Sequence, residues 1–412
     1  MGRVIITISG LLLGIGILLT GNALQGTLLV LRSANENFST TVIGLVMSMY
    51  FAGFILGTFL CPHIIQRVRH IRTFSIMAAI CSCSMVLLGI WVNPWVWGVI
   101  RFILGICIVG IFMVTESWLN NLASNANRAH IFGAYIIVNL VFLAAGQFLI
   151  QAGDINTLYL FAISASLFSL SLVPVALTRI PEPAVVAHVN LDVTSLYRIS
   201  ALGFTGSLVS GLLNSIFWTL GPLFARASGL DEFGIAMFMS ITIFGGIIMI
   251  WPIGIWSDHT DRRSIIIIVS SMIILTSVAA MLVPTGTYHW LGICMFVFGG
   301  MMFSIYPLSV AHTNDHPEAT DRVAVTSNLL LVYGIGAILG PVIGGILMGL
   351  FGPNSIFGLF IAGAGYLAYS AFYYRKHGQV IHEQDKTHYV PYVRTSQVAI
   401  DLESKQNDSA EN

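Results

Sequence analysis

Charge is scarce in this 412-residue chain, since only 9% of its residues are Asp, Glu, Lys or Arg. Soluble domains carry about 25% charged residues, so the composition excludes an ordinary soluble globular protein. The formal net charge is zero, which argues against nucleic acid as a partner. Hydrophobic residues make up 56% of the chain, and this excess is typical of a protein that lies within a lipid bilayer.

Cysteine is also rare, and no pattern of reactive residues stands out. The five cysteines lie in or beside apolar segments, and their spacing forms neither a metal motif nor a disulfide framework. We therefore expect buried thiols that pack as small hydrophobic groups. No Ser–His–acid set, metal-ligand cluster or phosphate-binding loop is evident, so we expect no cofactor, no metal and no enzymatic activity. These cysteines are Cys61, Cys81, Cys83, Cys107 and Cys294.

Twelve apolar segments are long enough to cross a bilayer, which takes roughly 20 residues as a helix. They lack the alternation of spanning β-strands. The first segment follows Arg3 and is too long for a signal peptide. The sequence thus predicts an all-α membrane protein with spans near residues 4–31, 42–65, 73–92, 95–118, 130–152, 158–178, 201–226, 234–257, 264–284, 289–312, 324–350 and 355–374.

Basic residues are distributed unevenly between the two sides of these spans. With the N-terminus inside, only Arg32 and Arg226 lie outside, and Arg101 lies within a span. The positive-inside rule therefore predicts that both termini are cytoplasmic. We expect the polar tail from 377 to be disordered. The basic residues on the inner side are Arg3, Arg67, Arg69, Arg72, Arg128, Arg179, Arg198, Arg262, Arg263, Arg322, Arg375, Lys376, Lys386, Arg394 and Lys405.

The chain contains an internal duplication. The charged turn at 254–263 has a diverged copy at 62–72, which begins 192 residues earlier, and Gly53 recurs as Gly245 at the same interval. Six spans per copy give both copies the same orientation, so we expect two parallel six-helix repeats. The predicted division is an N-terminal bundle, a cytoplasmic linker, a C-terminal bundle and a cytoplasmic tail, at 1–178, 179–200, 201–376 and 377–412.

The second turn carries a motif that resembles the major facilitator superfamily, and the likeness covers about residues 1–376. That family has a G-x-x-x-D-x-x-G-R-R-like turn between spans 2 and 3 and again between spans 8 and 9. Gly254, Asp258, Arg262 and Arg263 fit the pattern, while Asp261 replaces the second glycine. The resemblance implies twelve helices and a membrane transporter.

The first turn departs from that pattern. Pro62 replaces its first glycine, Gln66 replaces the aspartate and Arg69 replaces the second glycine. We expect the missing acid to be supplied by Glu116, through pairing with Arg67, Arg69 or Arg72. A proton relay at Glu116 is the alternative.

Further motifs support the resemblance. Arg101-x-x-x-Gly105 is similar to the family's span-4 motif, and Glu116-Ser117 with Tyr306-Pro307 is similar to its YcaD-like branch. A glycine–proline motif in span 11 is expected to allow close helix packing and a bend. In the family this motif marks drug antiporters when it lies in span 5, where this chain lacks the proline. The residues of the motif are Gly336, Gly340, Pro341 and Gly344.

Polar and aromatic side chains within the spans are candidate substrate contacts. The resemblance implies that spans 1, 4, 7 and 10 surround a central cavity, with solute bound near the midplane. An interhelical hydrogen bond, worth under ~1 kcal/mol, explains any single Asn or Gln equally well. Arg101 could hold an anionic group or take part in proton coupling, or it could be a structural arginine that is tied to carbonyl groups or snorkels outward. The candidates are Asn22, Gln25, Arg101, Asn139, Asn214, Trp218, Tyr306 and Tyr333.

The charged turns are candidate gates. We expect the Asp258 carboxylate to accept hydrogen bonds from Arg262 or from backbone N–H groups, in contacts that form in one state and break in the other. The alternative is that the two arginines only enforce topology. The predicted gating residues are Arg67, Arg72, Glu116, Gly254, Asp258, Arg262 and Arg263.

Taken together, these patterns predict a monomeric secondary transporter in the cytoplasmic membrane. It would move a small organic solute by rocker-switch alternating access, with protons as a coupling ion through Arg101 and Glu116. A non-transporting sensor or partner-binding scaffold is the alternative, because Gln66 replaces the motif's acid and the polar tail could bind a partner.

Overall fold

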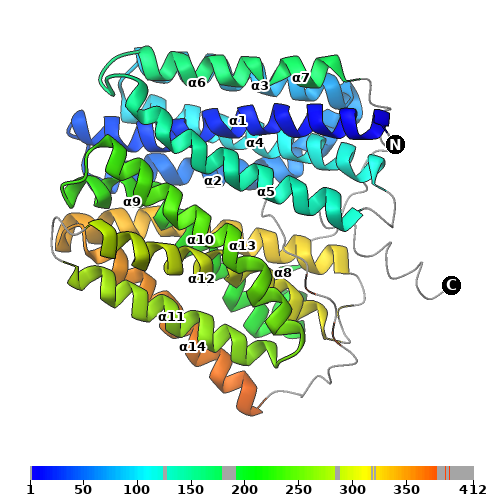
Figure 1. Cartoon of the computed structure of the whole chain (residues 1–412), viewed down its shortest axis with the longest axis vertical. Helices are drawn as coiled ribbons and strands as arrows, with labels where there is room; N and C mark the ends of the chain where they lie inside the picture. Colours follow the sequence, from blue (N-terminus) through cyan, green and yellow to red (C-terminus); the bar gives the residue numbers. More distant parts are fainter. Residues whose placement is uncertain are drawn as a thin grey trace. The chain divides into compact units, whose positions relative to one another are not determined.

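The computed structural model describes residues 2–123, 128–178, 192–283, 288–316, 319, 322–377, 386 and 389, and these contain helices and no strand (Figure 1). Twelve of the helical segments are long and apolar enough to cross a membrane, so the predicted all-α class with twelve spans is confirmed. The elements are α1 (Gly2–Asn35), α2 (Thr40–Val68), α3 (His70–Ile90), α4 (Pro94–Leu122), α5 (Arg128–Gln147), η1 (Phe148–Ala152), α6 (Tyr159–Leu170), α7 (Leu172–Leu177), α8 (Val193–Ile199), α9 (Ala201–Ala227), α10 (Glu232–Asp258), α11 (Arg262–Leu282), α12 (Tyr288–Asn314), α13 (Arg322–Phe351) and α14 (Ser355–His377).

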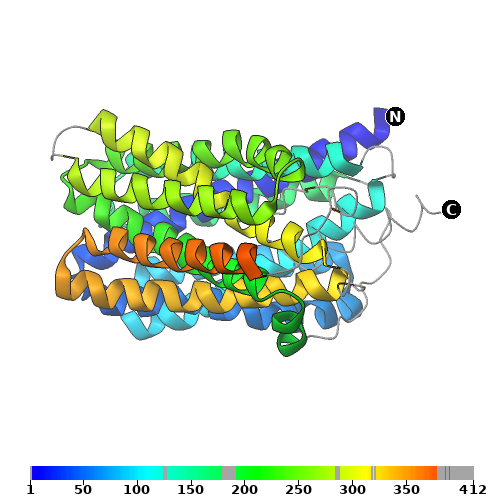
Figure 2. The same cartoon turned by 90° about the horizontal axis from the view of Figure 1, so that it is seen from below.

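The chain forms two compact units, one that contains α1–α7 and one that contains α8–α14. Within each unit the long helices lie side by side (Figures 1 and 2). In the first unit α1 packs on α5, α2 on α4 and α3 on α6. In the second unit the corresponding pairs are α9 with α13, α10 with α12 and α11 with α14. The same pairing in the same order is what a duplication of six spans predicts.

The predicted linker and tail lie mostly outside the described residues. Residues 179–191 are not described, and 193–199 form the short helix α8. The last helix, α14, ends at His377, and beyond it the structure describes only Lys386 and Tyr389.

In the first unit, two glycines allow α2 and α4 to touch through their backbones. A Cβ at Gly53 would overlap the carbonyl oxygen of Phe102, and a Cβ at Gly105 would overlap that of Tyr50. Small residues at helix contacts allow this approach in membrane proteins, where van der Waals packing and interhelical hydrogen bonds hold helices together.

The second unit repeats this contact between α10 and α12. A Cβ at Gly245 would overlap the carbonyl oxygen of Phe296, and a Cβ at Gly299 would overlap that of Thr242. Gly53 and Gly245, which the sequence matches at an interval of 192, therefore serve the same contact in their two units. The duplication has kept the helix packing along with the sequence pattern.

The sixth span differs from its prediction. The expected single helix over 158–178 is divided at Ser171 into α6 and α7. Pro174 explains the break, because it has no N–H to donate to the carbonyl of Leu170 and its ring clashes with that group.

The outer surfaces of both units are apolar. Leu177 and Leu282, for example, are 79% and 76% exposed, which suits contact with lipid rather than water. Cys61, Cys81 and Cys107 are buried as expected, and Cys294 is partly exposed. The expectation of a buried thiol is wrong for Cys83, which lies on the exposed face of α3.

We predict that Gly245→Ala destabilises the protein, because its methyl group would force α10 and α12 apart. Overpacking of this kind typically costs about 1–3 kcal/mol. Gly365→Ala on α14 is the control, since its methyl group would meet nothing within 4 Å. Thermal unfolding in detergent should show a lower midpoint for Gly245→Ala alone. Equal midpoints for the two variants would contradict the proposed role of this contact.

Candidate functional site

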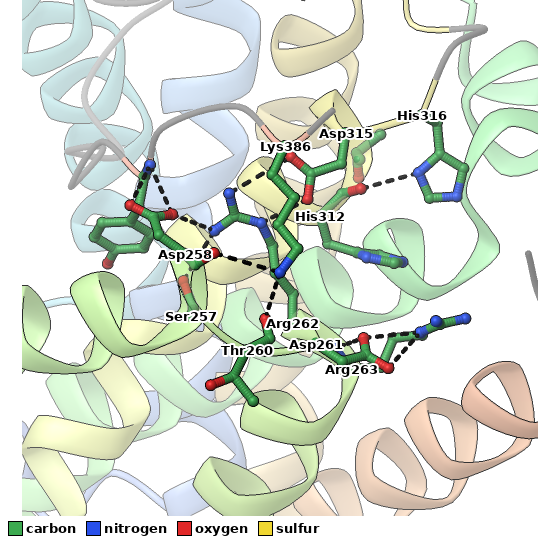
Figure 3. Close-up of polar contacts among 12 residues, drawn as sticks. Ser257, Asp258, Thr260, Asp261, Arg262, Arg263, His312, Asp315, His316 and Lys386 are labelled. Carbon is green, nitrogen blue, oxygen red and sulfur yellow. Dashed lines mark hydrogen bonds and ion pairs between the residues drawn. The ribbon is translucent and has the colours of Figure 1, made fainter. Parts of the chain in front are cut away.

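A buried arginine lies at the centre of the second unit's charged turn. Arg262 begins α11 and is only 1% exposed. Its Nε donates to Asp315 Oδ2 at 2.6 Å, while one terminal nitrogen lies 3.0 Å from Asp258 Oδ1 and 2.9 Å from Ser257 Oγ (Figure 3). Asp258 and Ser257 close α10, and Asp315 directly follows α12. One guanidinium therefore joins the ends of three helices.

The neighbouring residues fix this turn to a fourth helix. Asp261 caps α11 by accepting a hydrogen bond from the backbone N–H of Arg263 at 3.0 Å, and it also pairs with the Arg263 side chain. Arg263 donates to the carbonyl oxygen of Tyr374 in the last turn of α14 at 3.0 Å. An aspartate at the N-cap and cations near carbonyl ends are both favourable to helices.

The predicted contact between Asp258 and Arg262 is present, and its role as a gate stays a prediction. The shortest ion pair of Arg262, with Asp315, was not predicted from the sequence. Asp315 lies just beyond the predicted span 289–312, where an acid has no distinctive neighbours. What could have indicated a further acidic partner is that a buried arginine requires an opposite charge nearby.

Two tail residues also lie on this turn. The ammonium group of Lys386 donates to the carbonyl oxygen of Thr260 at 2.8 Å (Figure 3). The backbone N–H of Tyr389 donates to the Asp258 carboxylate at 3.0 Å. The predicted gating residue Gly254 lies under the Tyr389 ring. The expectation of a disordered tail is wrong for these two residues, and no sequence pattern pointed to their docking.

The first unit has a histidine at the equivalent place. His70 begins α3 as Arg262 begins α11, and its Nε2 lies 3.0 Å from Ser117 Oγ, in a contact whose donor depends on the tautomer. The histidine ring is 2% exposed and lies beside Trp118, with 6.0 Å between ring centroids. The buried arginine of the second unit thus has a histidine in the corresponding position.

Glu116 contacts a tyrosine that the sequence did not predict as its partner. This carboxylate is completely buried, and its Oε1 accepts a hydrogen bond from the Tyr135 hydroxyl of α5 at 3.0 Å. Arg67 and Arg72 are exposed and form no ion pair with any other residue that the structure describes. The expected pairing of Glu116 with Arg67 or Arg72 is therefore not formed among the described residues, and its pairing with Arg69 stays a prediction.

Arg69 has a backbone conformation that normally belongs to glycine. It joins α2 to α3 with φ 74° and ψ 166°, a region that a Cβ disfavours. The family pattern has its second glycine at this position. The counterpart in the second unit, Asp261, has φ −57° and caps a helix instead. The turn has kept the glycine geometry in the first unit although the glycine is gone.

Three predicted substrate contacts of the first unit carry buried polar atoms without a hydrogen-bond partner among the described residues. Gln25 on α1 and Asn139 on α5 are 0% and 3% exposed, and neither oxygen nor nitrogen of either amide is paired. Arg101 on α4 has an unpaired Nε, and its guanidinium lies over the Tyr50 ring at 4.5 Å from the centroid. Asn22, one turn before Gln25, is half-buried.

The predicted contacts of the second unit are mainly aromatic. Tyr306 of α12 and Tyr333 of α13 meet with ring centroids 5.3 Å apart. Trp218 of α9 lies 6.4 Å from Phe303, which is one turn before Tyr306. Asn214 is fully buried and donates to the Ser210 carbonyl of its own helix at 2.9 Å. The structure thus brings Tyr306 and Tyr333 together, and it places Trp218 beside a phenylalanine of the same helix as Tyr306.

The span-11 glycines face α9. A Cβ at Gly336 would overlap the backbone of Leu208, one at Gly340 would lie 2.6 Å from the carbonyl oxygen of Leu212, and one at Gly344 would lie 2.5 Å from Leu220. α13 continues through Pro341 as one helix.

We predict that Asp315→Ala destabilises the protein more than Asp258→Ala. Removing one partner of a buried pair costs about 3–5 kcal/mol. Asp315 is 2% exposed and Asp258 is 23% exposed, so water can replace only the second carboxylate. Thermal unfolding should rank the variants in this order, and Arg262→Met with Asp315→Leu should recover part of the loss. The opposite ranking would show that Asp258 is the principal partner.

Arg69 offers a second prediction. Arg69→Gly and Arg69→Ala both remove the side chain, but only glycine adopts a positive φ without strain. The glycine variant should therefore be more stable than the alanine variant by about 1–2 kcal/mol. Comparing the unfolding midpoints of the two variants separates the effect of backbone strain from that of losing the arginine side chain. An alanine variant that is as stable as the glycine variant would exclude strain at this position.

Comparison with known proteins agrees with this architecture. The profile of the Major Facilitator Superfamily matches residues 11–330. The uncharacterized MFS-type transporter YcaD of Escherichia coli O17:K52:H18 (strain UMN026 / ExPEC) is 29% identical over 356 residues, which cover 86% of this chain and 91% of YcaD. The nucleoside transporter NupG has a similar fold, with a TM-score of 0.70 at 16% identity, over 90% of this chain and 99% of NupG. A bacterial homolog of the human lysosomal transporter Spinster gives a TM-score of 0.69 at 15% identity, over 92% and 97% of the two chains. The profile match spans more than three quarters of the sequence, and the chain belongs to the major facilitator superfamily.

Proposed function

We propose that this protein is a secondary active transporter that moves a small organic solute across the cytoplasmic membrane by rocker-switch alternating access. The unpaired polar atoms of Gln25, Asn139 and Arg101 carry the proposal. A buried amide without a partner costs about 1–3 kcal/mol, and a solute that supplies the missing hydrogen bonds removes that cost while it is bound. Helix packing alone gives no reason to keep such groups.

Other polar residues of the same unit do form hydrogen bonds between helices, although Nε2 of Gln147 and Nε1 of Trp118 also have no partner among the described residues. The Thr27 hydroxyl of α1 donates to Gln147 Oε1 of α5 at 2.6 Å. The Ser164 hydroxyl of α6 donates to the carbonyl oxygen of Gly21 at 2.9 Å. Interhelical hydrogen bonds are therefore available in this unit, and we assign Gln25, Asn139 and Arg101 to the solute instead.

The positive charge of Arg101 narrows the class of solute. Arg101 has no acidic partner among the described residues, and its contact is with the face of the Tyr50 ring. A buried cation favours a solute that carries a carboxylate or several strong hydrogen-bond acceptors. The fold similarity to NupG adds nucleosides, which are rich in such acceptors, to the classes worth testing.

We assign the two-state element of the cycle to the charged turn. Arg262 joins the ends of α10, α11 and α12 through ion pairs that share one guanidinium, which supports a switch in which they form and break together. The buried Glu116, hydrogen-bonded to Tyr135, is our candidate for the site where a coupled proton binds. The distribution of Lys and Arg supports a cytoplasmic location for both termini and for this turn.

Binding by the purified protein tests this proposal. Organic acids, nucleosides, sugars and amino acids should be screened for thermal stabilisation, since a ligand that binds the folded state raises its apparent stability. For the solute that stabilises most, Gln25→Ala, Asn139→Ala and Arg101→Ala should each raise Kd about tenfold, as expected for one lost hydrogen bond.

Gln151→Ala is the matched control, because Gln151 is an exposed glutamine at the end of η1. The same solute should then accumulate in proteoliposomes under a pH gradient, and Glu116→Gln should remove the dependence on that gradient. Unchanged Kd in all three variants, or binding without any flux, would contradict the proposal.

A further inference from the structure

The end of α10 lacks a cation of its own. No basic residue lies in its last turn, so the carbonyl groups at this helix terminus have no positive side chain from the helix itself. Lys386 supplies one from the tail, with its Nζ 2.8 Å from the carbonyl oxygen of Thr260 and 3.4 Å from that of Asp258. A cation at a helix C-terminus is favoured by the free carbonyls and by the helix dipole.

The Asp258 carboxylate is shared between the network and the tail. One oxygen pairs with Arg262 at 3.0 Å, and both oxygens accept from the backbone N–H of Tyr389, at 3.0 and 3.2 Å. A carboxylate held by two donors is positioned more strictly than one held by a flexible side chain alone. The tail therefore contacts the same acid that orients the buried arginine.

The Tyr389 ring occupies the space that a side chain at position 254 would fill. A Cβ at Gly254 would overlap the ring and would lie 2.8 Å from its Cγ. Among the described residues, the nearest atoms to that position all belong to Tyr389. The absence of a side chain at Gly254 thus leaves room for the Tyr389 ring to pack against α10.

We propose that Lys386 and Tyr389 form a strap that docks on the α10–α11 turn and holds Asp258, Arg262 and Asp315 in their ion-paired arrangement. The docking surface consists of Gly254, Asp258 and Thr260, and its occupants are Lys386 and Tyr389 of this chain. The strap stabilises the closed form of the turn, and its release allows the turn to open.

Hydrogen exchange measures the ordering of the turn without any solute. Peptides that cover residues 254–264 should exchange about tenfold faster in Tyr389→Ala than in the wild type, because loss of the ring raises the population of the open turn. Tyr389→Phe is the matched control and should exchange as the wild type does, since it keeps both the ring and the backbone N–H. Lys386→Ala should also accelerate exchange, and Lys386→Arg should restore it.

A disulfide tests the docking geometry directly. The Cγ of Tyr389 is bonded to its Cβ at about 1.5 Å, so the Cβ atoms of Gly254→Cys and Tyr389→Cys would lie within about 4.5 Å, which a disulfide can bridge. With Cys83 and Cys294 replaced by serine, this pair should oxidise in full-length protein and resist labelling with a polyethylene-glycol maleimide. Tyr389→Cys with Leu282→Cys, at the other end of α11, is the control and should stay reactive.

Equal exchange in Tyr389→Ala and the wild type would overturn the strap, and so would equal oxidation of the two cysteine pairs. Neither measurement depends on transport, so the strap and the proposed function can fail separately. A Tyr389→Phe variant that exchanges as fast as Tyr389→Ala would also overturn the proposal, because the hydroxyl and not the ring would then carry the contact.

Discussion

The burial of one guanidinium group constrains the whole end of the second unit. Arg262 is 1% exposed, and a charge removed from water is tolerated only when opposite charges and hydrogen-bond acceptors surround it. Asp315, Asp258 and Ser257 meet that need from α12 and α10. The position of each helix end is therefore coupled to the others through a single side chain. A pair this deeply buried is weak support for stability alone, but it specifies an arrangement sharply, which suits a turn with two discrete states.

The two units show what a duplication conserves and what it allows to diverge. The helix pairing is the same in both, and the glycines that let α2 meet α4 also let α10 meet α12. Backbone contact of this kind tolerates no added atom, so it restricts sequence strongly. The charged turn has diverged, with His70 beside Ser117 in one unit and Arg262 beside Asp315 in the other. Packing is thus shared, while electrostatics distinguishes the units.

Much of this was visible in the sequence, because spans, glycine contacts and repeats all follow regular spacing. Twelve apolar segments and the 192-residue interval predicted the fold, and the motif predicted the contact of Asp258 with Arg262. Side-chain partners far apart in sequence were not predictable in this way. Asp315 lies 53 residues from Arg262 and Tyr389 lies 131 residues from Asp258, and no periodic pattern links them. Glu116 was assigned to the loop arginines for the same reason, since charge alone does not reveal its contact with Tyr135. The break at Ser171 had a local cause in Pro174 that the search for apolar length overlooked.

The distribution of paired and unpaired polar groups supports a division of work under the proposed function. The network at the α10–α11 turn is satisfied from several directions, by two acids, a serine and the tail. Gln25 and Asn139 in the first unit are buried among helices that elsewhere form hydrogen bonds with each other, yet neither amide has a partner among the described residues. A network whose donors and acceptors are all paired can hold a conformation but has no free hydrogen-bonding group for a ligand. An unpaired buried group is stabilised when a bound ligand supplies the missing hydrogen bond. The turn therefore fits the role of switch, because a switch requires paired groups that hold a conformation. The unpaired amides fit the role of binding site, because a binding site requires groups that are free to pair with a solute.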